Sequence, residues 1–158
     1  MPAFRSRSWY CNALTSPKLT IVNADAFAWL DAQRDAMFDV IVIDFPDPTN
    51  FSLGKLYTTA FYRLLAKHLS AQGYAAIQST SPLFARQSYW SIVETLKQAG
   101  LRTWPYHVYV PAFGEWGFVL AGSAAYEPPT RLPAGLRFLS PNNVAQLFVF
   151  PNDMLPVP

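Results

Sequence analysis

The run Asp39–Asp44 constrains the fold of this 158-residue chain more than any other segment. Four β-branched apolar residues stand between two aspartates, so both faces of a strand here would be apolar. Strands of that kind are typical of parallel sheets that are covered by helices on both sides. The run therefore predicts a central strand in an α/β protein.

The segments around this run alternate between strand and helix patterns. Short apolar runs predict further strands over 19–23, 74–78, 103–110 and 117–121. Apolar residues at helical spacing predict a helix that begins after Asp25 and helices over 56–69 and 89–96, with Gly73 and Gly100 as breaks. The last two strands are expected to pair antiparallel through a Pro-Ala-Phe-Gly-Glu-Trp turn. This order predicts a Rossmann-like, doubly wound sheet that lacks its first two strands and ends in an antiparallel hairpin.

The chain divides into three expected parts. Residues 1–18 carry no periodic pattern and are predicted to be irregular, with a short helix near Trp9–Leu14. Residues 19–122 hold the predicted sheet. Half of the fourteen prolines lie beyond residue 127, so 123–158 are expected to form an extended tail laid over the domain, with a helix at Asn142–Phe148.

Composition excludes several classes of protein. A net charge of +2 from twelve basic and ten acidic residues is too weak to predict a nucleic-acid partner. The single cysteine rules out a disulfide framework and fits a reducing compartment. No apolar run approaches the roughly 18–20 residues of a membrane span, and no Cys/His cluster has metal-ligand spacing. The chain is therefore expected to be soluble and cytoplasmic, without a metal.

Two aspartates mark the loop that follows the predicted central strand. Asp44 ends the strand and Asp47 lies three residues later, in a predicted loop over 45–54 that two prolines stiffen. Ligands of doubly wound folds bind outside the carboxyl ends of the strands, where this loop and a second predicted loop over 79–82 lie. Two carboxylates there would form an anionic pocket for a cationic amine, and one of them could accept its proton. The alternative is that Asp44 caps the next turn and Asp47 is a solvated turn residue.

The remaining polar candidates each have a structural alternative. Asp25 could accept a hydrogen bond from a nucleobase amine, or it could cap the helix that it opens. Gln78 could contact a substrate in the same crevice, or it could simply end its strand. His68 and His107 are predicted to be structural, and Cys11 has no partner that would support nucleophilic catalysis.

Five segments together resemble the spermidine synthase (polyamine aminopropyltransferase) family. They are Val22–Phe27, Phe38–Pro48, Leu56–Tyr57 with Phe61–Tyr62, Gln78–Pro82 and Val110–Phe118. The Asp-x-x-Asp-Pro element with its downstream Leu-Tyr and Phe-Tyr is specific, and the resemblance covers about residues 12–122. The run Phe-Pro-Asp-Pro-Thr-Asn-Phe-Ser-Leu-Gly-Lys-Leu-Tyr is most similar to the bacterial branch whose synthase domain follows a multi-span membrane region.

The resemblance implies a class I methyltransferase-type fold that transfers an aminopropyl group from decarboxylated S-adenosylmethionine to a diamine such as putrescine. The products would be spermidine and 5′-methylthioadenosine, with decarboxylated S-adenosylmethionine as co-substrate and no permanently bound cofactor. By position, Asp44 would accept the amine proton, and Asp25 with Ala26 would contact the adenine. The substrate-binding residues would be Asp47, Gln78 and Tyr57.

The chain also departs from the family pattern. It has neither the family's glycine-rich loop nor its N-terminal β-hairpin, so we expect a fragment or truncated gene product that is catalytically silent alone. Phe51 and Phe113 stand where the family often has Pro and Tyr. A homo-oligomeric parent and an upstream membrane region stay open. Two other functions also stay open, an S-adenosylmethionine-dependent methyltransferase and a non-catalytic remnant that binds a partner.

Overall fold

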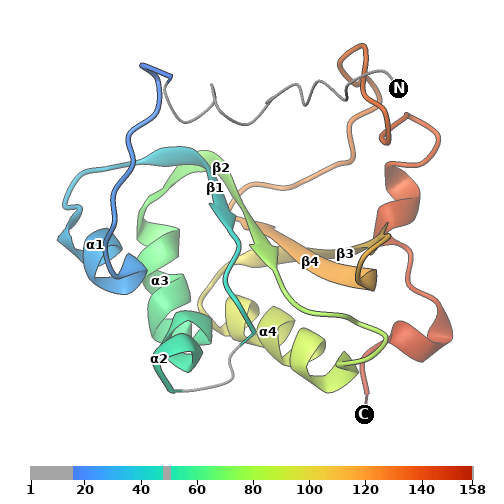
Figure 1. The fold of residues 1–158 in the computed structure, drawn as a ribbon, viewed down its shortest axis with the longest axis horizontal. Coiled ribbons are helices and arrows are strands. Elements are labelled where there is room, and N and C mark those ends of the chain that lie inside the picture. The colour runs from blue at the N-terminus through green and yellow to red at the C-terminus, as the bar shows by residue number, and fades with distance from the viewer. Residues whose placement is uncertain (1–15, 48–50, 158) are drawn as a thin grey trace, which may run out of the picture.

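A computed structural model describes residues 16–47 and 51–157, and a four-stranded sheet lies at its centre (Figure 1). The strands stand in the order β1-β2-β4-β3. β1 runs parallel to β2, whereas β2 with β4 and β4 with β3 pair antiparallel. The mixed sheet confirms an α/β fold that ends in an antiparallel hairpin. The strand bounds are Phe38–Ile43 for β1, Leu69–Gln78 for β2, Arg102–Val110 for β3 and Gly114–Gly122 for β4.

Helices cover one face of this sheet (Figure 1). Their bounds are Ala26–Ala32 for α1, Phe51–Gly54 for α2, Thr59–Lys67 for α3 and Arg86–Gln98 for α4, with 3-10 turns at Lys55–Tyr57, Ala145–Phe148 and Asn152–Met154. α1 packs against α3 through Phe27 and Phe61, whose ring centres lie 5.7 Å apart. Asp25 caps α1 by accepting from the Ala28 backbone N–H at 3.0 Å, and Gly100 follows α4 with a φ of +93°. Both ends are as predicted.

The two faces of the sheet differ in burial because side chains alternate between them along each strand. The helix face packs against α3 and α4, and its central side chains are at most 5% exposed: Ile43, Ala75, Ile77, Val119 and Ala121. The opposite face, called the open face below, begins at β1 with Val40 and Val42, which are 69% and 73% exposed. The core therefore lies on one side of the sheet.

Two strand predictions are wrong. Residues 19–23 form no strand, and Ile21 and Val22 are 66% and 52% exposed. β1 is not central, because in the described chain it pairs with β2 alone. A β-branched run indicates an extended backbone, but burial depends on which other segments reach it, and that is not written in the run itself.

Gly73 lies inside β2 rather than between a helix and a strand. The helix predicted over 56–69 is confirmed with shorter bounds, because α3 ends at Lys67 and β2 begins at Leu69. The predicted break at Gly73 is wrong. A Cβ atom at position 73 would lie 2.8 Å from the Phe38 carbonyl oxygen. Glycine is therefore required there because β1 approaches β2 closely.

Three further boundaries differ from the predictions. The loop predicted over 45–54 contains α2, and the hairpin turn covers 111–113 only. In the tail, the 3-10 turn at Ala145–Phe148 replaces the helix predicted over 142–148. We call residues 145–157 the strap. The predictions for residues 1–15, including the helix near 9–14 and Cys11, lie outside the described residues.

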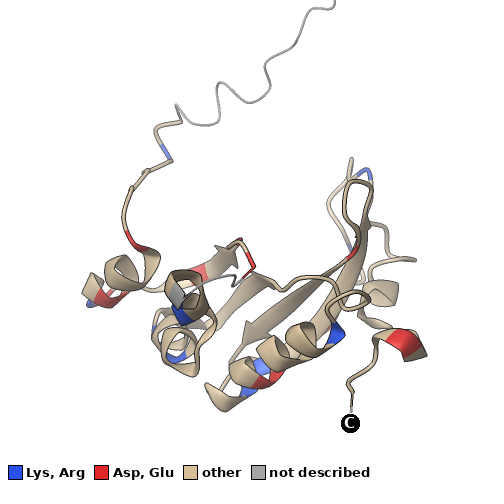
Figure 2. Ribbon diagram, turned by 60° about the horizontal axis from the view of Figure 1, so that its bottom comes forward, with Lys and Arg blue, Asp and Glu red and all other residues tan. Residues whose placement is uncertain are grey.

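Charged residues are scattered over the described surface. Figure 2 shows Lys and Arg interspersed with Asp and Glu. None of the helices within 16–47 and 51–157 combines the length and the hydropathy needed to cross a membrane.

Candidate active site

The loop that follows β1 carries the two predicted carboxylates. Asp44 and Asp47 are both exposed, and Tyr57 fastens the backbone between them. The Tyr57 hydroxyl lies 3.1 Å from the carbonyl oxygens of both Phe45 and Pro46 and donates to this pair. The two carboxylates are therefore presented from a loop whose backbone is held at Phe45 and Pro46.

Gln78 fastens the same loop from the end of β2. With its amide oriented to satisfy both ends, its nitrogen donates to the Phe45 carbonyl oxygen at 3.0 Å. Its oxygen accepts from Trp116 Nε1 at 2.8 Å. Gln78 and Asp44 line the same cavity, and the Gln78 amide links the post-β1 loop to β4.

Thr80 is a site residue that the sequence analysis missed. Its hydroxyl donates to Asp47 Oδ2 at 3.1 Å, and its φ is +60°, a value that β-branched residues rarely adopt. Its carbonyl oxygen accepts from the Gly117 backbone N–H at 2.7 Å. A Cβ atom at position 117 would lie 2.7 Å from that same oxygen, so glycine on β4 lets the loop after β2 come close enough to hold Asp47.

Two neighbouring cavities meet the loop. The first, of about 490 Å³, lies on the open face beside Asp44 and Gln78. Its other lining side chains are apolar or aromatic: Val42, Ile43, Ala76, Tyr106, Val110, Phe113, Trp116 and Phe118. The second, of about 560 Å³, lies along α4 and is lined by Asp47, Tyr57 and Thr80 together with Ala85, Gln87, Ser88, Ser91, Ile92 and Thr95. The two carboxylates that the sequence placed in one pocket thus line different cavities.

The aromatic wall of the first cavity was also missed as part of a site. The sequence does carry a pattern that indicates this wall, because aromatic residues alternate with other residues along β3 and β4. The register pairs Tyr106 with Phe118, and partners across a sheet point to the same face. Phe113 and Trp116 stand in a segment that carried the family resemblance, although no role was assigned to them.

Two tyrosines beneath the loop have contrasting surroundings. Burial, followed by the charges of Asp47 and Asp44, raises the pKa of Tyr57 to about 12, so its hydroxyl remains a neutral donor. Tyr62 is fully buried, and its hydroxyl has no hydrogen-bond partner within the described chain. Burial also raises the pKa of Tyr62.

Asp25 and Ala26 lie apart from these cavities. Besides capping α1, Asp25 pairs with Lys55, whose Nζ lies 2.6 Å from Oδ2. The hydrogen bond from Lys55, together with that from the Ala28 N–H, lowers the pKa of Asp25. Ala26 lines a separate hollow of about 300 Å³ with Thr20, Val22, Ala24 and Trp29. The contact with adenine therefore stays a prediction for both residues.

The two histidines lie away from the carboxylates. His68 is buried at the C-cap of α3, where Nδ1 lies 2.8 Å from the Ala36 carbonyl oxygen, and its structural role fits the prediction. His107 lies on the helix face of β3 and contacts Glu115 on β4. Within 16–47 and 51–157, no three His, Cys, Asp or Glu side chains are grouped to hold a metal ion.

Comparison with known proteins gives consistent results. The sequence profile of the spermine/spermidine synthase domain matches residues 4–128. The chain is 54% identical over 145 residues to polyamine aminopropyltransferase 2 of Ralstonia nicotianae, covering 90% of the chain and 28% of that relative. It is 51% identical over 146 residues to the polyamine aminopropyltransferase of Leptospira interrogans, covering 92% and 29%. The chain thus spans less than a third of the length of these relatives.

Solved structures agree on the fold. A spermidine synthase in complex with the transition-state analogue AdoDATO superposes with a TM-score of 0.78 at 20% identity, covering 89% of this chain and 51% of that one. The spermidine synthase of Thermotoga maritima gives a TM-score of 0.75 at 20% identity, covering 89% and 50%.

Proposed function

Because this chain belongs to the spermine/spermidine synthase family, we propose that its domain transfers an aminopropyl group from decarboxylated S-adenosylmethionine to a diamine such as putrescine. In this reaction the amine nitrogen forms a bond to the aminopropyl carbon while the bond from that carbon to sulfur breaks. The positive charge leaves sulfur and appears on nitrogen, which then loses a proton. The products are a longer polyamine and 5′-methylthioadenosine.

The observation that carries the proposal is the position of Asp44 at the rim of an aromatic cavity beside Gln78. An alkyl ammonium has a pKa near ~10.4 and cannot attack carbon until it loses a proton. Asp44 would accept that proton and orient the nitrogen. Because the sulfonium is already a good leaving group, alignment of the neutral amine is the main task left to the protein.

The surroundings of Asp44 suit an amine with an alkyl chain. Aromatic faces such as those of Tyr106 and Trp116 attract cations and bury methylene groups at the same time. Asp47 would hold the second charge of the diamine from the neighbouring cavity, with Thr80 and Tyr57 setting its position. Gln78 would hold the loop through the Phe45 carbonyl oxygen, and it would also lie beside the amine at the cavity rim.

For the co-substrate, we assign the adenine contact to Asp25 and Ala26. Asp25 Oδ1 accepts from the Ala28 N–H and Oδ2 accepts from Lys55, and a carboxylate oxygen can accept two bonds. A further bond from an exocyclic amine is therefore compatible with the cap of α1. The nucleoside would arrive and leave as substrate and product, so no resident cofactor is needed.

Calorimetric titration of the chain with putrescine tests the amine site directly. We expect the wild type to bind putrescine and Asp47→Asn to bind it about tenfold more weakly. Loss of one charge-assisted contact should cost roughly 1.4 kcal/mol of binding free energy. Asp39→Asn is the matched control, since Asp39 lies at the other end of β1 and bonds to Ser70 at 2.6 Å. Equal putrescine affinity in both variants and the wild type would contradict the assignment.

The transfer itself is measured as release of 5′-methylthioadenosine from decarboxylated S-adenosylmethionine. We expect release that requires putrescine and is matched by the longer polyamine when the complete domain is assayed, because the chain alone is expected to be catalytically silent. Release of S-adenosylhomocysteine from S-adenosylmethionine would instead identify a methyltransferase. Titration with 5′-methylthioadenosine, with Asp25→Ala beside the wild type, tests the adenine contact independently of the amine site.

A further inference from the structure

The strap crosses the edge strand β3 so that two nearby phenylalanines lie on opposite faces of the sheet. Phe148 packs on the open face, with its ring centre 5.5 Å from that of Tyr106. Phe150 packs on the helix face, 4.8 Å from the His107 ring and 5.9 Å from the Tyr89 ring. Tyr106 and His107 are consecutive in β3 and therefore point to opposite faces. The strap therefore crosses the edge of the sheet at β3 and contacts both of its faces.

Three side chains hold the strap by donating to its backbone carbonyls. His107 Nε2 lies 2.9 Å from the Val149 oxygen, and Trp90 Nε1 donates to the Met154 oxygen at 2.8 Å. Arg86 bonds to the oxygens of Leu155 and Pro156. Trp90 and Arg86 both come from α4, so among these three donors His107 is the one that lies in the sheet.

The strap braces the wall of the cavity that contains Asp44. Tyr106 and Phe118 line that cavity and stack on each other, with ring centres 5.3 Å apart and planes 18° apart. From the helix face, the Tyr89 hydroxyl lies 3.0 Å from the Phe118 oxygen and 3.3 Å from the Tyr106 oxygen. From the open face, Phe148 covers Tyr106. The wall is therefore fixed from both sides, and the strap supplies one of them.

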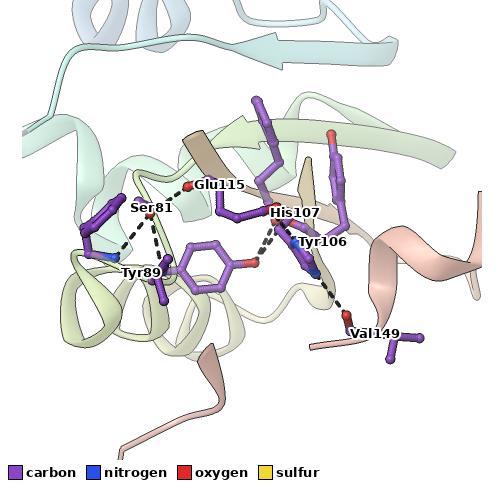
Figure 3. Close-up of polar contacts among 9 residues, drawn as sticks. Ser81, Tyr89, Tyr106, His107, Glu115 and Val149 are labelled. Carbon is purple, nitrogen blue, oxygen red and sulfur yellow. Dashed lines mark hydrogen bonds and ion pairs between the residues drawn. The ribbon is translucent and has the colours of Figure 1, made fainter. Parts of the chain in front are cut away.

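Both ring nitrogens of His107 face acceptors (Figure 3). Nδ1 lies 2.8 Å from Glu115 Oε2, and Nε2 faces the Val149 oxygen. A neutral imidazole has one N–H, so only the doubly protonated ring donates to both acceptors. The Glu115 backbone oxygen also accepts from Ser81 Oγ at 2.6 Å, which links this contact to the loop after β2.

The groups packed around His107 come from three elements. β4 contributes the Glu115 carboxylate, which is its one charged partner among the contacts of the described chain. α4 contributes Tyr89, whose hydroxyl is directed at the two wall carbonyls. The strap contributes the Val149 carbonyl and the Phe150 ring, and an aromatic ring beside an imidazolium is a favourable neighbour.

We propose that His107, in its doubly protonated form, is a positioning residue that fastens the strap over β3 and thereby holds the Tyr106–Phe118 wall in the shape that binds the amine. The link to amine binding rests on the proposed function, whereas the latch itself does not. Loss of the two His107 contacts should loosen the strap and weaken amine binding.

Hydrogen exchange of the strap in the wild type and in His107→Gln tests the latch. We expect protection over 145–157 to be about tenfold lower in His107→Gln, while α3 stays equally protected in both proteins. The chain has two histidines, so imidazole NMR, with His68→Gln for assignment, should show His107 protonated at both nitrogens when the strap is closed. A strap that exchanges equally slowly in both proteins, or a His107 ring that carries one proton, overturns the latch.

Putrescine titrations separate the latch from the function. We expect His107→Gln and Phe148→Ala each to weaken binding three- to tenfold. If both variants bind like the wild type, the positioning role is wrong and the proposed function stands. If the wild type binds no amine but the strap of His107→Gln exchanges faster than that of the wild type, the latch stands, and the proposed function and the positioning role both fail.

Discussion

The helix face and the open face of the sheet are built from similar residues but have different surroundings. Val119 on the helix face is fully buried, whereas Val42 on the open face is 73% exposed. Both valines lie in strands, and both alternate with side chains of the other face. The difference arises because α3 and α4 cover one face, while the described chain leaves β1 uncovered on the other.

The two faces therefore differ in what they contribute: one carries the core that stabilises the fold, and the other carries the candidate site. The helix face carries the apolar core, whose burial is the main favourable contribution to folding. The open face carries Asp44, Gln78 and the aromatic wall at the carboxyl end of the strands. Substitutions on the helix face should therefore change the free energy of unfolding, whereas substitutions on the open face should change amine binding or transfer.

The largest expected effect is that of Asp44→Asn on transfer. In the complete domain, loss of the proposed proton acceptor should lower the rate of aminopropyl transfer about 10²- to 10⁴-fold. The free energy of unfolding should change by less than about 0.5 kcal/mol, because Asp44 is exposed. Rates of product release and urea denaturation of the same two preparations check this pair of results. An unfolding free energy that falls by several kcal/mol would place Asp44 in the structural part of the sheet instead.

A matched pair of valines tests the contrast from the other side. Val119→Ala removes two buried methyl groups and should lower the free energy of unfolding by about 2 kcal/mol. Val42→Ala removes the same atoms from the open face and should change it by less than about 0.5 kcal/mol. Equal losses in urea denaturation would show that β1 is covered in solution.

Two Tyr→Phe substitutions sharpen the comparison for polar groups. Tyr57→Phe removes a donor to two loop carbonyls and should lower the free energy of unfolding by about 1 kcal/mol. Tyr62→Phe removes a buried hydroxyl without a partner in the described chain and should raise it by about 1 kcal/mol. Thermal denaturation of both variants gives the signs. A loss for Tyr62→Phe would mean that its hydroxyl has a partner in solution.

The smallest effect concerns the ionisation of Tyr57. An unfolded tyrosine loses its proton near pH ~10, whereas burial and the two carboxylates raise the pKa of Tyr57 to about 12 in the folded chain. The folded state then holds more protons than the unfolded state between these values. The stability that Tyr57 contributes is therefore present below about pH 10 and is lost as the pH rises through about 12. Difference absorbance of wild type against Tyr57→Phe measures this ionisation, and Asp47→Asn should lower its midpoint.

Local structure was predictable where it depends on contacts between residues that are close in the sequence. Asp25 caps α1 and Gly100 follows the end of α4, as short-range capping rules predict. The segments that bear Asp44, Asp47, Tyr57 and Gln78 were identified from spacing and from the family resemblance. The structure brings those four residues to one loop, although their roles in catalysis stay predictions.

What could not be predicted depends on contacts between distant segments. Residues 19–23 and β1 are both apolar and β-branched, yet only β1 finds a strand to pair with. Thr80 has a positive φ, and its carbonyl oxygen accepts from Gly117, which is 37 positions away and leaves room for this contact. The crossing of β3 by the strap depends on aromatic contacts that have no sequence period. In each case the deciding partner lies far along the chain.

The two edges of the sheet have opposite consequences for how the chain behaves in concentrated solution. The strap packs against β3, whereas in the described chain β1 pairs on one side only and has Val40 and Val42 exposed. An apolar edge of this kind is a template on which another chain can add a strand, and lysine is a residue that natural edges use to prevent this. Self-association should therefore begin at β1, and one lysine at position 40, at the end of β1 away from Asp44, should delay it without touching the site.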